Sequence, residues 1–178
     1  MFFELRRKTI HAFLALLFAF SAPFVTYNTL ISASIALFVF FIFARLLGIS
    51  ARIGTVPRKT YGELFFALGI LGALILSFPD VLLFQLAVVI LAVADPLSAL
   101  FGTAYGRQVF QILGEKRSVE GSVACFVSAG MILILFSVPL LVSVTVAFML
   151  TLIEAFSPRG SDNFFLPLST IVMLQFLR

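Results

Sequence analysis

The chain has 178 residues, of which 62% are hydrophobic and 11% charged, and its net charge is +4. Its mean hydropathy is +1.19. Charged residues alone make up about 25% of an ordinary soluble domain, so this composition excludes one and predicts an all-α, polytopic membrane protein with no nucleic acid among its partners. With one cysteine, Cys125, and one histidine, the chain also lacks a disulfide framework and the ligands of a Cys and His zinc site.

Seven apolar segments, each about long enough to cross a bilayer as a helix, follow one another along the chain. They cover residues 11–27, 29–48, 62–78, 81–105, 118–137, 139–156 and 162–177. Only short connections remain between them, which leaves no room for a separate soluble domain. Residues 1–178 are therefore expected to form a single transmembrane domain.

The charged residues predict how the segments are oriented. The N-terminus and the connections after the second, fourth and sixth segments carry all 12 basic residues except Arg178. Short loops rich in Lys and Arg stay in the cytoplasm, so we expect a cytoplasmic N-terminus and an external C-terminus. The acidic residues gather on the same side, with Asp80 as the exception. This one-sided charge predicts a cytoplasmic site, at the plasma membrane in a prokaryote or the endoplasmic reticulum in a eukaryote.

Asp95 stands in the middle of the fourth apolar segment, where a carboxylate costs about 2.5 to 3.5 kcal/mol on insertion scales. A functional role is one explanation, and a structural pairing with a neighbouring helix is the other. Pro96 lacks an N–H group, so a kink or break of the helix is predicted at Asp95. Counted from Asp80 and Pro139, Asp95 and Glu154 both lie 15 residues into their segments, or about 22 Å along a helix, which predicts one shared depth.

Two short basic segments, residues 58–63 (RKTYGE) and 116–122 (KRSVEGS), each lead into an apolar helix. The free N–H groups and dipole of a helix N-terminus favour anions, and Lys or Arg neutralise phosphate, so both segments suit phosphate binding. Neither contains the Walker A pattern. Taken singly, each is also an ordinary feature of a membrane-surface loop.

The N-terminal helix presents a mixed polar stripe. Glu4, Lys8 and His11 recur at helical spacing with Arg7 beside them, so they share one face. A topology signal accounts for the two basic residues, but it does not account for a glutamate and a histidine on the same face. Membership of a site is the other interpretation.

Four residues near the cytoplasmic side, Asp95, Glu154, Asp162 and Asn163, offer oxygen ligands only, which suits Mg²⁺. Such carboxylates beside phosphate-binding segments indicate phosphoryl or nucleotidyl transfer. A Ser-His-Asp hydrolase is not indicated, because the single histidine lies in the first apolar segment and no nucleophile-elbow motif occurs. A small transporter with a cation site at Asp95 and Glu154 predicts an internal repeat, which the sequence lacks. A purely structural protein has no use for the helix-entry motifs.

Five stretches carry a family resemblance: residues 4–11, 58–63, 94–107 (ADPLSALFGTAYGR), 116–122 and 154–167. In these, and over nearly its whole length, the chain resembles the membrane family that includes dolichol kinase, phytol and farnesol kinase, and the CTP-dependent diacylglycerol kinase of fungi. The resemblance implies Mg²⁺-dependent transfer of the γ-phosphate of CTP to the hydroxyl of a membrane lipid alcohol. A distant likeness to CTP-dependent phosphatidate cytidylyltransferases supplies the alternative, synthesis of a CDP-lipid.

The resemblance and the residue chemistry together give a set of expected roles. The expected catalytic residues are Asp95, Asp162 and Lys116, with Asp95 as the candidate proton acceptor. Mg²⁺ is expected at Asp95, Asp162, Asn163 and Glu154. The nucleotide is expected to contact Arg7, Lys8, His11, Arg58, Lys59, Arg107, Arg117, Ser118, Glu120, Gly121 and Ser122. The family often has Lys followed directly by Ser where this chain inserts Arg117, so the choice between Lys116 and Arg117 as the phosphate contact stays open.

Overall fold

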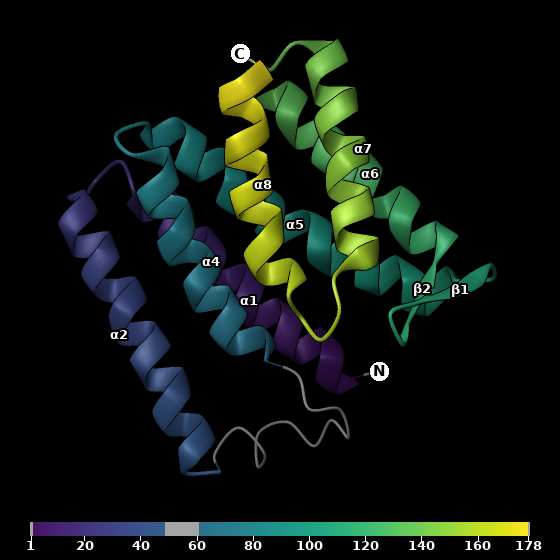
Figure 1. The fold of residues 1–178 in the computed structure, drawn as a ribbon, viewed down its shortest axis with the longest axis horizontal. Helices are drawn as coiled ribbons and strands as arrows, with labels where there is room; N and C mark the ends of the chain where they lie inside the picture. Colours follow the sequence, from purple (N-terminus) through teal and green to yellow (C-terminus); the bar gives the residue numbers. More distant parts are fainter. Residues whose placement is uncertain (1, 49–60, 178) are drawn as a thin grey trace.

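The computed structural model describes the backbone of residues 2–48 and 61–177, with side chains from Lys8 onward. In these ranges the chain forms seven α-helices and one β-hairpin, arranged as shown in Figure 1. The elements are α1 (Phe2–Ser21), α2 (Tyr27–Leu46), α4 (Gly62–Ser77), α5 (Val81–Tyr105), β1 (Val109–Ile112), β2 (Glu115–Ser118), α6 (Val119–Leu135), α7 (Leu140–Phe156) and α8 (Asp162–Leu177).

Each of the seven predicted apolar segments forms one helix, so the helical fold class is confirmed. Two described helices, α2 and α5, are long and apolar enough to cross a membrane. The other five are shorter apolar helices. Seven membrane crossings and the sides on which the termini lie stay predictions.

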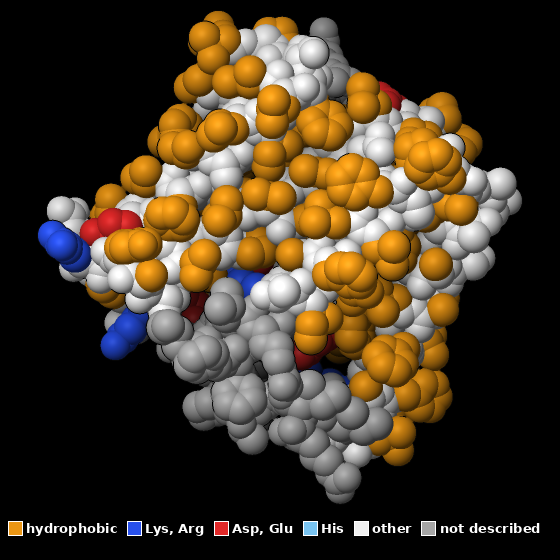
Figure 2. Space-filling model, turned by 180° about the vertical axis from the view of Figure 1, so that it is seen from behind, with side chains coloured by type: hydrophobic (Ala, Val, Ile, Leu, Met, Phe, Trp, Pro, Cys, Tyr) orange, Lys and Arg blue, Asp and Glu red, His pale blue; other side chains and the backbone are white. Residues whose placement is uncertain are grey.

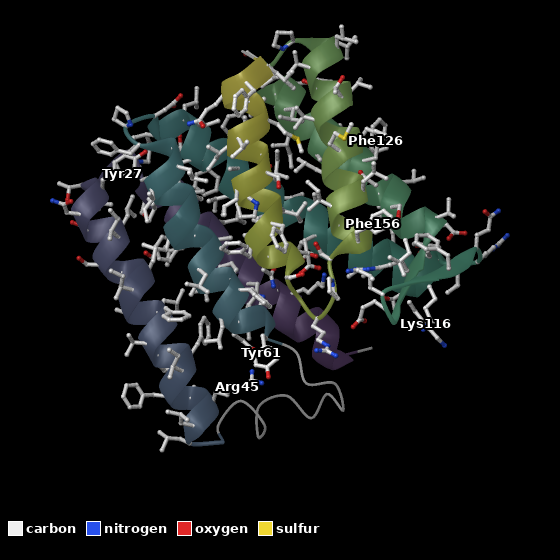
Figure 3. All side chains as sticks on the ribbon, viewed as in Figure 1. Tyr27, Arg45, Tyr61, Lys116, Phe126 and Phe156 are labelled. Atoms are coloured by element: carbon white, nitrogen blue, oxygen red, sulfur yellow. The ribbon has the colours of Figure 1, made fainter. Side chains whose placement is uncertain are left out.

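Helix α5 is the centre of the bundle, because it packs against α1, α4, α6 and α8. Figure 1 shows α4, α7 and α8 in front of α1, α5 and α6. Helix α2 packs on α4 at the edge, where the guanidinium of Arg45 lies 4.3 Å from the centre of the Tyr61 ring, and both residues are labelled in Figure 3. The start of α1 and the end of α8 lie at opposite ends of the bundle (Figure 1).

A kink or a break was predicted at Asp95, and of these two the break is wrong. Helix α5 continues through Pro96 to Tyr105. A proline inside a helix costs about 3 kcal/mol through the lost hydrogen bond and a steric clash. Residues on both sides of it, including Leu91, Ala94 and Ser98, are buried, so packing against the neighbouring helices holds the two halves as one element.

The connection between α5 and α6 contains a structure that the sequence analysis missed. Strands β1 and β2 pair antiparallel, with Val109 opposite Ser118 and Ile112 opposite Glu115. Leu113 and Gly114 join them with φ of 50° and 82°, the left-handed pair that a tight hairpin turn needs. The hairpin occupies residues expected to be a plain loop, and Ser118 ends β2 and caps α6 instead of belonging to the helix.

Helices α4 and α8 touch through their backbones at Gly69, and this contact gives a test. A Cβ atom at Gly69 would collide with the carbonyl oxygen of Asn163. We expect Gly69→Ala to destabilise the protein by about 1–3 kcal/mol through overpacking, visible as a lower Tm in detergent. The control is Gly130→Ala, whose Cβ would lie 3.7 Å from that of Ala147, an ordinary contact. Equal Tm values for the two variants would contradict the prediction.

Candidate active site

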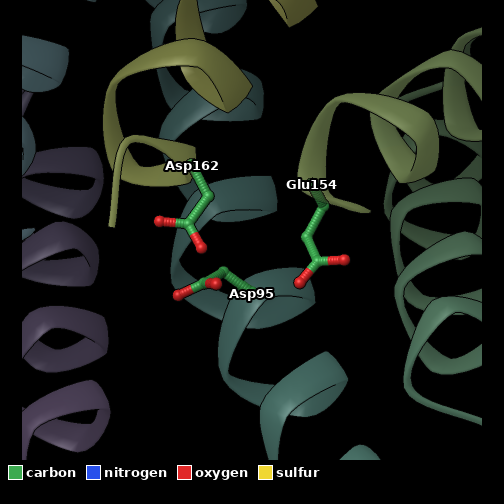
Figure 4. Close-up of side chains that lie close together, drawn as sticks. All are labelled: Asp95, Glu154 and Asp162. Carbon is green, nitrogen blue, oxygen red and sulfur yellow. The ribbon is translucent and has the colours of Figure 1, made fainter. Parts of the chain in front are cut away.

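Three buried carboxylates from three helices converge on one point. Asp95 comes from α5, Glu154 from α7 and Asp162 from α8, and one oxygen of each lies within 4.8 Å of the others. Figure 4 shows the three side chains turned toward one another. Their exposed fractions are 3%, 1% and 5%. The structure thus brings together three of the residues that were assigned to one metal site from the sequence, including Asp95 and Glu154, which were expected at one depth.

Lys8 of α1 holds Asp95. Its Nζ lies 2.6 Å from Asp95 Oδ1 and donates a second hydrogen bond to the Asp95 carbonyl oxygen at 3.3 Å. Both side chains are buried, at 8% and 4% exposed. A buried carboxylate is costly without such a partner, so this pair accounts for the tolerance of Asp95 inside the bundle.

Arg117 of β2 holds the other two carboxylates. Its Nη1 lies 2.6 Å from Glu154 Oε1 and its Nη2 lies 3.7 Å from Asp162 Oδ2. The same Nη2 donates a hydrogen bond to the Ser157 carbonyl oxygen at 2.8 Å. Burial opposes the charge of Arg117, but the neighbouring carboxylates outweigh it and raise the pKa of the guanidinium above its ordinary value. Arg117 is therefore cationic at any physiological pH.

A pocket of about 290 Å³ opens beside the carboxylates. Glu154 and Asp162 line the pocket. Asp95 is not part of the lining, but its ion-pair partner Lys8 is. The lining residues come from α1, α5, the hairpin, α6, α7, α8 and the α7–α8 connection: Lys8, Ser98, Ala99, Gly102, Thr103, Val109, Glu115, Lys116, Arg117, Ser118, Gly121, Ser122, Glu154, Arg159, Gly160 and Asp162.

One wall of the pocket is suited to an anion. Ser118 caps α6 by accepting a hydrogen bond from the N–H of Gly121 at 3.1 Å, so the first turn of α6 borders the pocket. Lys116 lies on the hairpin, is exposed, and lines the pocket (Figure 3). Because the Arg117 guanidinium is already engaged by two carboxylates, Lys116 is the better placed of the two basic residues to meet a phosphate.

Several predicted site residues lie away from the pocket lining. His11 is buried and stacks on Phe66, with ring centres 4.9 Å apart. Glu120 Oε1 accepts hydrogen bonds from the backbone N–H groups of Arg107, at 2.9 Å, and Gln108, at 3.3 Å. These hydrogen bonds connect the first turn of α6 to the backbone just before β1, so Glu120 stabilises the base of the hairpin. Arg107 itself is exposed there.

Asn163 is buried next to Asp162. Its Nδ2 donates a hydrogen bond to the Gly62 carbonyl oxygen at 3.2 Å, while its Oδ1 has no hydrogen-bond partner among the described atoms. Arg58 and Lys59 lie outside the described residues, as does the side chain of Arg7.

The α7–α8 connection contributes two pocket residues that the sequence analysis did not select, Arg159 and Gly160. Both have positive φ, 55° and 86°. The Arg159 carbonyl oxygen accepts a hydrogen bond from Tyr61 N–H at 3.3 Å, and a Cβ at Gly160 would lie 2.8 Å from Gly62 Cα. The connection is thereby fixed against the start of α4. In the sequence, Arg159 was counted only among the basic residues that predict topology, although it lies within the stretch 154–167 that carries the family resemblance.

The chain is 30% identical over 130 residues to a phytol kinase of Synechocystis sp. (strain ATCC 27184 / PCC 6803 / Kazusa). The chain belongs with the polyprenol and phytol kinase-like family. The match covers 67% of this chain and 55% of the relative, so the chain spans about half the length of that protein. No protein-family profile and no solved structure matches the chain.

The carboxylate cluster of this chain fits a hard divalent cation. Asp95, Glu154 and Asp162 provide carboxylate oxygens, and the unpartnered Asn163 Oδ1 is a further oxygen on the residue after Asp162. Oxygen ligands of this kind suit Mg²⁺ and do not suit zinc or copper.

Proposed function

We propose that the chain is a lipid-alcohol kinase, which transfers the γ-phosphate of CTP to the hydroxyl of a polyprenol, phytol or diacylglycerol type of acceptor. One observation carries the proposal: three buried carboxylates converge, and two of them, Glu154 and Asp162, line a pocket whose other walls hold Lys116, Arg159 and the capped start of α6. Phosphoryl transfer is catalysed mainly by positioning and by charge neutralisation, which this set of groups can supply. The similarity to a phytol kinase supports a kinase over a cytidylyltransferase.

Mg²⁺ bound by Asp95, Glu154, Asp162 and Asn163 would neutralise charge on the triphosphate. Lys116 and Arg159 bind phosphate oxygens in this proposal, and the positive end of the α6 dipole adds to their attraction for the anion. The acceptor oxygen forms a bond to the γ-phosphorus, the bond from that phosphorus to the β-phosphate oxygen breaks, and CDP leaves. The hydroxyl proton passes to a carboxylate of the cluster: Glu154 and Asp162 line the pocket, and Asp95, the acceptor expected from the sequence, lies against Lys8.

The proposal includes a membrane setting with the pocket at the cytoplasmic end. The helix ends that carry the basic connections are the N-terminal ends of α1, α4, α6 and α8 and the C-terminal ends of α2, α5 and α7. Pocket residues come from these same ends of α1, α5, α6, α7 and α8, which supports a single charged side of the bundle. Basic connections of this kind remain cytoplasmic.

The test is a transfer assay with purified protein, Mg²⁺ and either γ-labelled CTP or γ-labelled ATP. The acceptor panel is dolichol, geranylgeraniol, phytol and diacylglycerol, followed by thin-layer separation. We expect label in the lipid product with CTP. Label from ATP alone would overturn the choice of donor. A CDP-lipid formed from a phosphorylated acceptor would establish cytidylyl transfer instead, and the absence of any labelled lipid would contradict the kinase proposal.

A further inference from the structure

Helix α5 has one open face. Val89, Val93, Pro96, Leu100 and Thr103 recur at alternating spacings of four and three residues, so they form one strip along the helix. The first three are half-buried, Leu100 is 42% exposed and Thr103 is exposed. We call these five residues the α5 strip. On the opposite side of α5, residues such as Ala87, Leu91 and Asp95 are buried against the surrounding helices, and outside the strip the exposed residues lie at the two ends of the helix, Leu82, Phe101, Ala104 and Tyr105.

The helices on either side of the strip add apolar side chains to the same surface. Helix α1 exposes Ile10 and Phe13, at 46% and 66%, and α6 exposes Val123 and Val127, at 53% and 48%. Figure 2 views the molecule from behind, where α1, α5 and α6 lie. Hydrophobic side chains cover much of this view, and basic and acidic atoms show in a hollow at its lower part.

The strip runs into the pocket at its C-terminal end. Thr103 and Ala99, one turn apart on α5, both line the pocket. The Thr103 hydroxyl donates to the Ala99 carbonyl oxygen, so its hydrogen-bonding capacity as a donor is used within the helix. Val109 of β1 and Lys8 of α1 also line the pocket. An apolar surface and a charged pocket are therefore continuous at this point of the molecule.

We infer that the hydrocarbon tail of the lipid acceptor lies on the α5 strip between α1 and α6, and that its hydroxyl enters the pocket past Thr103. The inference rests on the proposed function, because it takes the acceptor to be a lipid alcohol. A molecule with its head in the pocket needs an adjoining apolar surface for its tail. The strip meets the pocket directly, whereas α7 contributes only Glu154 to the described lining.

The absence of tryptophan from the chain makes a direct test possible. Leu100→Trp places a single fluorophore on the strip. Leu152→Trp is the matched control, because Leu152 is similarly exposed, at 39%, and lies on α7 two residues before Glu154. Each variant is reconstituted in phosphatidylcholine nanodiscs and titrated with dibrominated phytol, whose bromine atoms quench nearby tryptophan.

We expect a saturable loss of emission from Leu100→Trp that unbrominated phytol reverses, and only a small, unsaturable loss from Leu152→Trp. Equal losses in the two variants, or a loss that unbrominated phytol does not reverse, would overturn the inference. Val93→Trp, deeper on the strip, replaces Leu100→Trp if that variant does not fold. The wild-type transfer assay separates the two proposals: transfer without selective quenching contradicts the tail position alone, and quenching without transfer contradicts the kinase proposal alone.

Discussion

Replacing Asp162 with asparagine is expected to reduce lipid-alcohol phosphorylation by about 10²-fold or more, as the loss of a single group that stabilises transition-state charge does elsewhere. The substitution keeps the size of the side chain and removes its charge from the cluster. It is also the mildest change available among the three acids. Asp162 Oδ2 is 3.7 Å from Arg117, which keeps its 2.6 Å contact with Glu154 in the variant.

The backbone around Asp162 is expected to tolerate the change. Asp162 Oδ1 accepts a hydrogen bond from the N–H of Asn163 at 2.9 Å, and the amide oxygen of an asparagine accepts the same bond. Retained transfer would therefore show that the Asp162 charge has no part in the reaction. The measurement is the rate of label transfer, with Tm in detergent as the check on folding.

Asp80→Asn is the matched control for this change. Asp80 caps the N-terminus of α5 by accepting a hydrogen bond from Leu83 N–H at 2.9 Å. Asparagine caps helices about as well as aspartate, so this variant keeps wild-type transfer. Equal loss of transfer in both variants would point to a general effect of removing an acid, and it would contradict the specific role of Asp162.

The helices were predictable because each consists of an apolar run bounded by charged or turn-forming residues. The hairpin was not predictable from the sequence. Its two strands have only four residues each, and its turn is formed by Leu113 and Gly114, whereas Asn-Gly or Asp-Gly is the usual sequence signal for such a turn. The expected break at Asp95 failed for a related reason. The local effect of Pro96 favours a break, and burial on both sides of it, which only the tertiary fold provides, prevents one.

The shared level of Asp95 and Glu154 was predictable from depth, because the fourth and sixth spans run in the same direction and both acids lie at equal distances along them. Asp162 was placed near them by its position at the cytoplasmic entry to the seventh span. The partners of these acids were not predictable. No pattern in the sequence indicates that Lys8 pairs with Asp95, which lies 87 residues further along the chain. Nor does any pattern indicate that Arg117, and not Lys116, forms an ion pair with Glu154. His11 shares a helix face with Lys8 as predicted, yet its ring stacks on Phe66.

Removing the Arg117 side chain is expected to be strongly destabilising. Arg117→Met leaves the buried Glu154 and Asp162 carboxylates without the cation, and breaking a buried ion pair from one side costs about 3–5 kcal/mol. The variant also loses the hydrogen bond to the Ser157 carbonyl oxygen, which ties β2 to the end of α7. We expect a large drop in Tm in detergent. Arg107→Met is the matched control, since Arg107 is exposed at the base of the same hairpin and a change there has a small effect.

A second substitution separates the charge effect from the loss of packing. If Arg117→Met destabilises the protein because it leaves the Glu154 carboxylate without a cation, then Glu154→Gln in the same chain removes that unpaired charge. The double variant then loses less stability than the sum of the losses in the two single variants. The Tm values of wild type, both single variants and the double variant measure this coupling. Additive losses would mean that Arg117 stabilises the hairpin through packing and its bond to Ser157, and that its 2.6 Å contact with Glu154 contributes no net stability.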